Sequence, residues 1–212
     1  QLKADLTPPS ASGPFALRLE LAPSLFASDP RSEVLRVTVR GRDVASFERQ
    51  PLALTLVIDN SGSMKEGGRM ELVKGAVREL LGSLYASDSV AVVVFSQTAR
   101  VLTERISAAN RGVLEDQILA IPIEGGTNAE AGLVLGYELA GRGIAPNSVN
   151  RVVLFSDGVA NIGELDQKRI LDTVREHRTR GIYLNTFGVG MGNHDDDFLE
   201  QLGIGQTTLS FR

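Results

Sequence analysis

The sequence predicts an α/β fold: a Rossmann-like, doubly wound and mostly parallel sheet flanked by helices. From residue 51 onward, short apolar runs alternate with segments whose apolar residues recur at helical spacing, the pattern of a doubly wound sheet. The runs 54–58 and 152–155 are rich in β-branched residues and leucine and are too short for a typical helix. They are therefore expected to be strands buried on both faces. Asp59 follows the first run, and Asp157 closes the second after one serine.

An N-terminal extension, residues 1–50, is predicted to precede this domain and to contain two strands. Residues 15–21 and 35–39 alternate apolar and polar side chains, which indicates strands with one buried face. The loop 22–33 would let them form a wide antiparallel pair. A two-stranded sheet is marginal by itself, so we expect a structural role and a covering surface for the pair. Residues 1–14 are rich in proline and serine and favour an extended lead-in.

The elements of the domain, residues 51–212, are predicted in order from these periodicities. Beyond the two runs above, strands are expected at 90–95, 101–102, 182–187 and 207–211, and helices at 70–85, 111–120, 129–140, 166–180 and 196–202. The apolar residues of the first helix are Leu72, Val73, Ala76, Leu80, Leu81 and Leu84. The final strand is expected to be a weak edge of the sheet.

Composition limits the classes of function. The 212 residues are 42% hydrophobic, enough for one well-cored domain and an appendage. A net charge of -4 without a long basic run argues against a nucleic-acid partner. The absence of cysteine excludes disulfides, thiolate metal sites and a cysteine nucleophile. No apolar run approaches the roughly 20 residues of a transmembrane segment, and no signal segment opens the chain.

Oxygen-bearing side chains gather where ligands bind in open α/β sheets, at the carboxyl ends of the strands. Alternate residues of Asp59-x-Ser61-x-Ser63 can aim their oxygens at one point, and carboxylate and hydroxyl oxygens suit a hard cation such as Mg²⁺. Thr127, in a glycine-flanked loop, and Asp157 could join them. The local alternative is that these residues form turns and cap the following helices.

This combination resembles the metal-ion-dependent adhesion site of the von Willebrand factor type A domain. The matches are Asp59-x-Ser61-x-Ser63, Thr127 in Gly-Gly-Thr-Asn, and Asp157 in Ser-Asp-Gly. The resemblance covers residues 51 to about 202. The segments 14–17 and 39–42 are similar to those preceding this domain in bacterial cell-envelope proteins, which suggests that compartment. Residues 203–212 depart from the family pattern and look cut short or altered.

The resemblance implies a site for Mg²⁺, with Mn²⁺ or Ca²⁺ as substitutes. Ser61, Ser63 and Thr127 would contact the ion directly or nearly so, and Asp59 and Asp157 mainly through water. An Asp or Glu carboxylate of a protein partner would complete the shell. The expected function is metal-dependent protein binding without catalysis. One alternative is a regulatory subunit of an ATP-driven chelatase or chaperone-like complex, and a weaker one is a phosphotransfer or hydrolytic enzyme using Asp59 and the ion.

The remaining motifs give weaker evidence of function. Gly188-x-Gly190 after a strand resembles part of a dinucleotide fingerprint, but Asn193 replaces its last glycine, so a glycine turn is expected. The sequence contains no P-loop, nucleophile elbow or zinc-protease motif. His177 lies on a charged helix and is expected to be a solvated surface residue. The acidic segment 194–197 is interpreted as helix capping rather than a second cation site.

Overall fold

The computed structural model describes residues 15–23, 32–41, 49–144, 147–157, 164–190 and 207–211. The chain divides into two compact units, Gln1–Arg49 and Gln50–Arg212. The first contains β1 (Phe15–Pro23) and β2 (Glu33–Gly41). The second contains β3 (Leu52–Asp59), η1 (Gly62–Gly68), α1 (Arg69–Ser83), β4 (Ser89–Phe95), β5 (Ala99–Ser107), η2 (Ala108–Asn110), α2 (Arg111–Leu119), α3 (Ala129–Arg142), β6 (Val149–Ser156), α4 (Glu164–Thr179), β7 (Ile182–Val189) and β8 (Thr207–Phe211). The predicted helix 196–202 and the acidic segment 194–197 lie outside the described residues.

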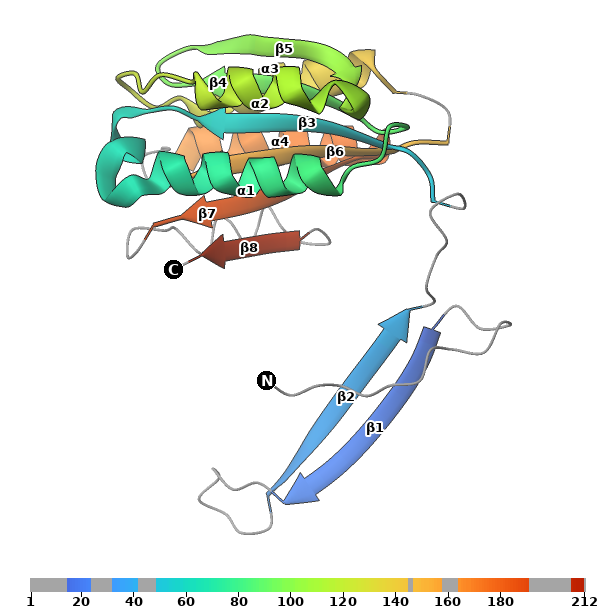
Figure 1. The fold of residues 1–212 in the computed structure, drawn as a ribbon. Coiled ribbons are helices and arrows are strands. Elements are labelled where there is room, and N and C mark those ends of the chain that lie inside the picture. Colours follow the sequence, from blue (N-terminus) through green and yellow to red (C-terminus); the bar gives the residue numbers. More distant parts are fainter. Residues whose placement is uncertain are drawn as a thin grey trace. The chain divides into compact units, whose positions relative to one another are not determined.

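The second unit is built on one sheet with the strand order β5-β4-β3-β6-β7-β8 (Figure 1). Neighbouring strands are parallel except β5, which runs antiparallel to β4. The predicted fold class is confirmed. The strand expected at 101–102 runs from Ala99 to Ser107. The prediction was too short because charged residues such as Arg100 and Glu104 interrupt the apolar pattern of this strand. Such interruptions are ordinary on an edge strand, where one side meets water.

Helices cover both faces of this sheet, and each face has its own apolar cluster. Val57 of β3 packs in the cluster formed with α3 and α4, whereas Leu56 and Ile58 pack in the cluster formed with α1 and α2. Successive strand residues point to opposite faces, so burial on both faces explains the continuous apolar run of β3. No helix of the described residues is long and apolar enough to cross a membrane.

The inward side of α1 differs from the prediction in two residues, because Leu72 and Ala76 are both exposed. Leu72 is 60% exposed, while Met70, Val73, Val77 and Leu81 are buried. Residues spaced three and four apart share a helix face, and Leu72 lies about 100° from its neighbour Val73 around the axis. Its apolar character therefore gave a misleading signal.

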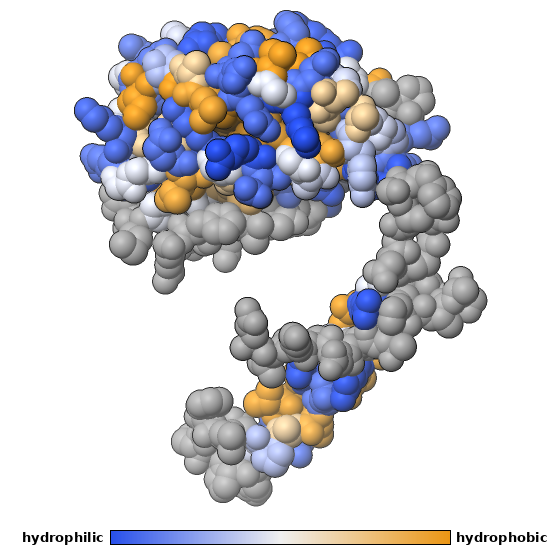
Figure 2. Space-filling view, viewed as in Figure 1, coloured by the Kyte–Doolittle hydropathy of each residue, from blue (hydrophilic) through white to orange (hydrophobic). Residues whose placement is uncertain are grey.

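The first unit confirms the predicted antiparallel pair, with Leu17 opposite Val39 and Leu19 opposite Val37. Apolar residues gather on one face of the pair and are more than half exposed (Figure 2). On the other face, Glu20 lies 3.0 Å from Arg18 and 3.6 Å from Arg36. This division between an apolar and a charged face is what the alternation predicts, and the covering surface stays a prediction.

β8 forms the edge predicted for it, since it pairs only with β7 among the described strands. We expect the amides of 207–211 to exchange with solvent faster than those of 54–58 and 152–156, because edge strands open at lower free energy than central ones. Hydrogen exchange followed by mass spectrometry measures the difference. Equal protection of β8 and β3 would contradict it.

Candidate functional site

Asp59 ends the central strand β3 and is fully buried. The Ser61 backbone N–H donates to its Oδ1 at 2.9 Å, and the Ser156 hydroxyl donates to its Oδ2 at 2.7 Å. Burial raises the pKa of Asp59, the hydrogen bonds from Ser61 and Ser156 oppose this rise, and the charge of Asp157 adds to it. A carboxylate held in this way lacks sufficient counter-charge, which is the environment of a cation ligand.

Two serines connect the loop of Asp59 to Asp157. The hydroxyls of Ser61 and Ser63 lie 3.1 Å apart, and the Ser63 hydroxyl donates to Asp157 Oδ1 at 3.0 Å. Ser61 is the N-cap of η1, but its side chain makes no capping bond. The capping explanation is therefore wrong for Ser61. The turn explanation holds only for Asp59, which accepts from the backbone two residues on. Four of the five predicted residues thus lie together.

Arg69 belongs to the same cluster and was not predicted. Its Nη1 lies 2.6 Å from Asp157 Oδ2 and 3.3 Å from the Ser63 carbonyl oxygen. It is the first residue of α1. A cation at a helix N-terminus opposes the helix dipole, and this unfavourable placement was the available sequence signal.

Asn60 and Ser96 tie the loop of Asp59 to the segment that carries Thr127. The Asn60 side-chain amide donates to the Pro122 carbonyl at 2.9 Å, and the Asn60 backbone carbonyl accepts from the Glu124 N–H at 2.8 Å. The Ser96 carbonyl accepts from the Asn128 N–H at 2.7 Å. These bonds hold the 122–128 segment beside the ends of β3 and β4.

Thr127 is exposed in this segment, and no hydrogen bond joins it to the other four predicted residues in the described structure. Asn128, and not Thr127, caps α3, since its Oδ1 accepts from the Ala131 N–H at 2.9 Å. The capping explanation of Thr127 is therefore wrong. Gly126 has φ +80°, and a Cβ there would lie 2.9 Å from Gln97 Cβ. Glycine at this position sets the backbone path into Thr127.

The chemistry of the cluster fits a hard cation. Its side-chain donors are carboxylate and hydroxyl oxygens, which suit Mg²⁺, Mn²⁺ or Ca²⁺ rather than a softer metal. The described part of the chain contains no group of three His, Cys, Asp or Glu that could hold a metal by themselves. A metal ion bound at this cluster would therefore need hydroxyl oxygens, such as those of Ser61 and Ser63, among its ligands.

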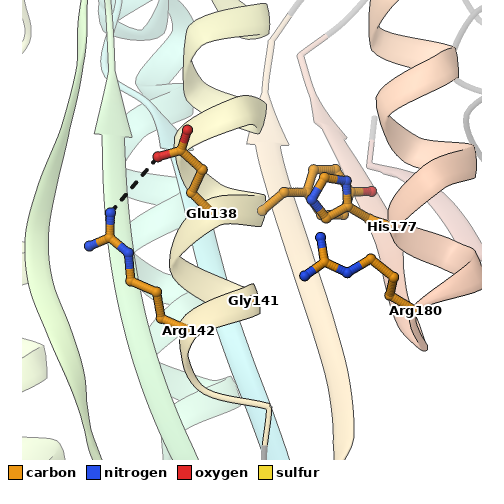
Figure 3. A pocket seen from close by; sticks show the side chains of 6 residues that line it. Glu138, Gly141, Arg142, His177 and Arg180 are labelled. Carbon is orange, nitrogen blue, oxygen red and sulfur yellow. Dashed lines mark ion pairs between the residues drawn. The ribbon is translucent and has the colours of Figure 1, made fainter.

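A separate pocket of about 470 Å³ lies at the C-terminal ends of α3 and α4 (Figure 3). It is lined by Tyr137, Glu138, Gly141, Arg142, His177 and Arg180. Basic side chains at helix C-termini complement the helix dipoles, and Arg142 also lies 3.9 Å from Glu138. These two local interactions account for the charges of the pocket.

His177 corrects one expectation. It is half-buried, its ring stacks on Tyr137 with centroids 4.4 Å apart, and its Nδ1 lies 2.9 Å from the Thr173 carbonyl. A carbonyl only accepts, so Nδ1 carries a proton and donates. The residue packs α4 against α3 and is not simply solvated.

Comparisons with known proteins show the family to which the chain belongs. The sequence profile of the von Willebrand factor type A domain matches residues 53–212. The chain is 32% identical over 205 residues to the uncharacterized protein YfbK of Escherichia coli (strain K12), covering 96% of this chain and 35% of YfbK. It is 32% identical over 160 residues to the inter-alpha-trypsin inhibitor heavy chain H2 of Homo sapiens, covering 72% of this chain and 17% of that protein.

A solved structure, the von Willebrand factor type A protein from Catenulispora acidiphila, superposes with a TM-score of 0.67 at 18% sequence identity. The match covers 93% of this chain and 46% of that one. The chain thus spans less than half the length of each of these proteins. Neither sequence relative bears the name of an enzyme. By its sequence and its fold, the chain belongs to the von Willebrand factor type A domain family.

Proposed function

We propose that this chain is a Mg²⁺-dependent protein-binding module that captures an Asp or Glu carboxylate of a partner protein. The observation that carries the proposal is the continuous set of hydrogen bonds joining Asp59, Ser61, Ser63 and Asp157 at the carboxyl edge of β3 and β6. Oxygen donors from two separate strand ends meet there. Thr127, on the adjoining segment, is the fifth proposed ligand.

Each residue has a distinct proposed role. The Ser61 and Ser63 hydroxyls are neutral donors whose short spacing favours contact with a common ion. Asp59, held by Ser61 and Ser156, and Asp157, held by Ser63 and Arg69, supply negative charge from fixed positions. A divalent ion bound here would act as a Lewis acid toward an incoming carboxylate. The proposal requires no catalytic step.

Divalent-ion binding tests the proposal directly. Ser61→Ala/Ser63→Ala should weaken Mg²⁺ and Mn²⁺ binding by at least about 100-fold, because loss of a mere outer-shell partner already costs 10–100-fold. Ser83→Ala, which removes an exposed hydroxyl from the end of α1, is the matched control and should bind like the unaltered chain. Isothermal titration calorimetry gives the affinities, and circular dichroism confirms folding. Equal affinities in folded proteins would refute the site.

The partner can be sought by affinity capture with the chain as bait. A partner that uses the site should be retained in Mg²⁺, released by a chelator, and absent from the Ser61→Ala/Ser63→Ala bait. Replacing the Asp and Glu residues of its contact segment should then abolish the Mg²⁺-dependent part of the affinity. Retention of that part would show that no partner carboxylate is used.

The glycines before Thr127 provide a second test. Gly126→Ala forces a Cβ into the left-handed region and toward Gln97, at a cost of about 1–2 kcal/mol for the backbone alone. If Thr127 is a ligand, the displaced loop should weaken Mn²⁺ binding. Gly125→Ala is the matched control, since nothing lies within 4 Å of its added Cβ. Identical Mn²⁺ affinities in the two variants would remove Thr127 from the ligand set.

A further inference from the structure

We propose that Arg69 is a positioning residue that also sets the charge of the candidate metal site. It fixes Asp157 and acts as a built-in cation that lowers the affinity of the site for a divalent ion. This inference rests on the proposed function, because it concerns the same site.

The contacts of Arg69 join two loops of the site. Its Nη1 approaches Asp157 Oδ2 at 2.6 Å and the Ser63 carbonyl at 3.3 Å, while the other Asp157 oxygen accepts from the Ser63 hydroxyl. The side chains of Arg69 and Asp157 are 19% and 5% exposed. A short ionic hydrogen bond with so little solvent is screened weakly, so Arg69 determines where the Asp157 carboxylate points.

The fold makes room for the guanidinium group at a specific place. Gly190, at the end of β7, has φ +114°, and a Cβ there would lie 2.6 Å from Arg69 Nε. A larger residue would force the Arg69 side chain to shift, and the positive φ would also strain its own backbone. Glu66 lies 3.9 Å from Arg69 Nη1 but is 73% exposed, so it competes only weakly with Asp157.

Local preferences do not explain an arginine at this position. Arg69 is the first residue of α1, where the helix dipole disfavours a cation. The N-cap of the helix is Gly68, which has no side chain that could cap it. The interaction that compensates comes from Asp157, 88 residues away in the sequence. The contact with Asp157 in the candidate site, and not helix propensity, therefore explains the presence of an arginine at position 69.

The charges have two consequences. Asp59, Asp157 and Arg69 together give the site a net charge of minus one, which a divalent ion changes to plus one. The site thus attracts the ion less strongly than two carboxylates alone would. After the ion is bound, the positive net charge favours an anionic group on the partner. Arg69 therefore lowers the affinity of the site for the metal ion and strengthens its attraction for an acidic partner.

Substitution of Arg69 separates this role from a merely structural one. Arg69→Gln removes the charge and should bind Mn²⁺ several-fold more tightly than the unaltered chain, whereas Arg69→Lys should stay close to it. The gain in Arg69→Gln should persist at high salt, because the Arg69 side chain is only 19% exposed and its repulsion of the ion is screened weakly. In a chelator, the same variant should unfold at a lower temperature, because Asp157 has lost its counter-charge.

The matched control is Arg78→Gln, which removes an exposed positive charge from the same helix. It should change neither the Mn²⁺ affinity nor its salt dependence. Arg69→Met is a second charge-removing variant, for use if Arg69→Gln does not fold. The apolar methionine side chain can pack beside Gly190. The same gain in affinity is expected for it.

Titration with Mn²⁺ alone, followed by electron paramagnetic resonance, gives the dissociation constants. If the unaltered chain binds no Mn²⁺, the proposed function fails and this inference fails with it. If the unaltered chain binds Mn²⁺ and Ser61→Ala/Ser63→Ala does not, the proposed metal site stands. Unchanged or weaker Mn²⁺ binding by the folded Arg69→Gln or Arg69→Met protein then overturns the inference alone.

Discussion

Replacing Asp59 by asparagine is expected to weaken divalent-ion binding by about 10–100-fold and to stabilise the metal-free protein. Burial raises the pKa of Asp59, so its charged form destabilises the fold at neutral pH. Asparagine keeps nearly the same shape without the charge. Its Oδ1 can accept from the Ser61 N–H, and the Ser156 hydroxyl can turn to accept from its amide. Opposite effects on binding and stability would show that Asp59 is placed for a ligand.

The pH dependence follows from the direction of the pKa shift. The folded protein binds the Asp59 proton more tightly than the unfolded chain, whose value is near 3.8. The contribution of Asp59 to the free energy of unfolding therefore falls as pH rises from that value to the raised folded pKa, and is constant above it. Thermal unfolding of both proteins in a chelator, from acid to neutral pH, measures the difference. An Asp59→Asn protein less stable than the unaltered chain at neutral pH would contradict the account.

Gly136→Val is expected to give the largest loss of stability. In α3, a Cβ at Gly136 would lie 2.5 Å from Val57 Cγ2 of β3, and Gly132 meets Phe95 in the same way at 2.6 Å. The helix approaches the sheet closely because both positions lack a side chain. Overpacking here should cost about 3 kcal/mol, which lowers the Tm of a protein of this size by about 10 °C.

Gly75→Val in α1 controls for the change in helix propensity. Nothing lies within 4 Å of a Cβ added at Gly75, and valine is a slightly better helix former than glycine. This variant should keep or slightly raise the Tm. Thermal unfolding by circular dichroism compares the two variants. An unchanged Tm for Gly136→Val would mean that α3 does not lie this close to β3.

The strands and the helix sequence were predictable because local patterns specify them. The apolar runs of β3 and β6 have few alternatives at their length, and their terminal acids indicate the edge where ligands bind. Asp59, Ser61, Ser63 and Asp157 were therefore identified from the sequence, and the structure brings them together. Thr127 was assigned by resemblance, and its role as a ligand stays a prediction.

The missed features depend on contacts between distant parts of the chain. Arg69 and Asp157 are separated by 88 residues, and nothing near Arg69 indicates an acidic partner at the end of β6. In the sequence, Ser156 is only the polar end of a strand. Its hydrogen bond to Asp59 depends on the pairing of β6 with β3. Leu72 was misplaced for a related reason. Helical spacing defines a stripe, but only the sheet beneath α1 decides which residues face it.

The most direct test of the central claim is the position of a bound Mn²⁺ ion, measured by anomalous X-ray diffraction from crystals of this chain grown with the metal. We expect a single strong peak at the carboxyl edge of β3 and β6, at about 2.1 Å from the hydroxyl oxygens of Ser61 and Ser63. Asp59, Asp157 and Thr127 should surround it. A peak far from these residues, or no peak in crystals grown with Mn²⁺, would contradict the proposed metal site.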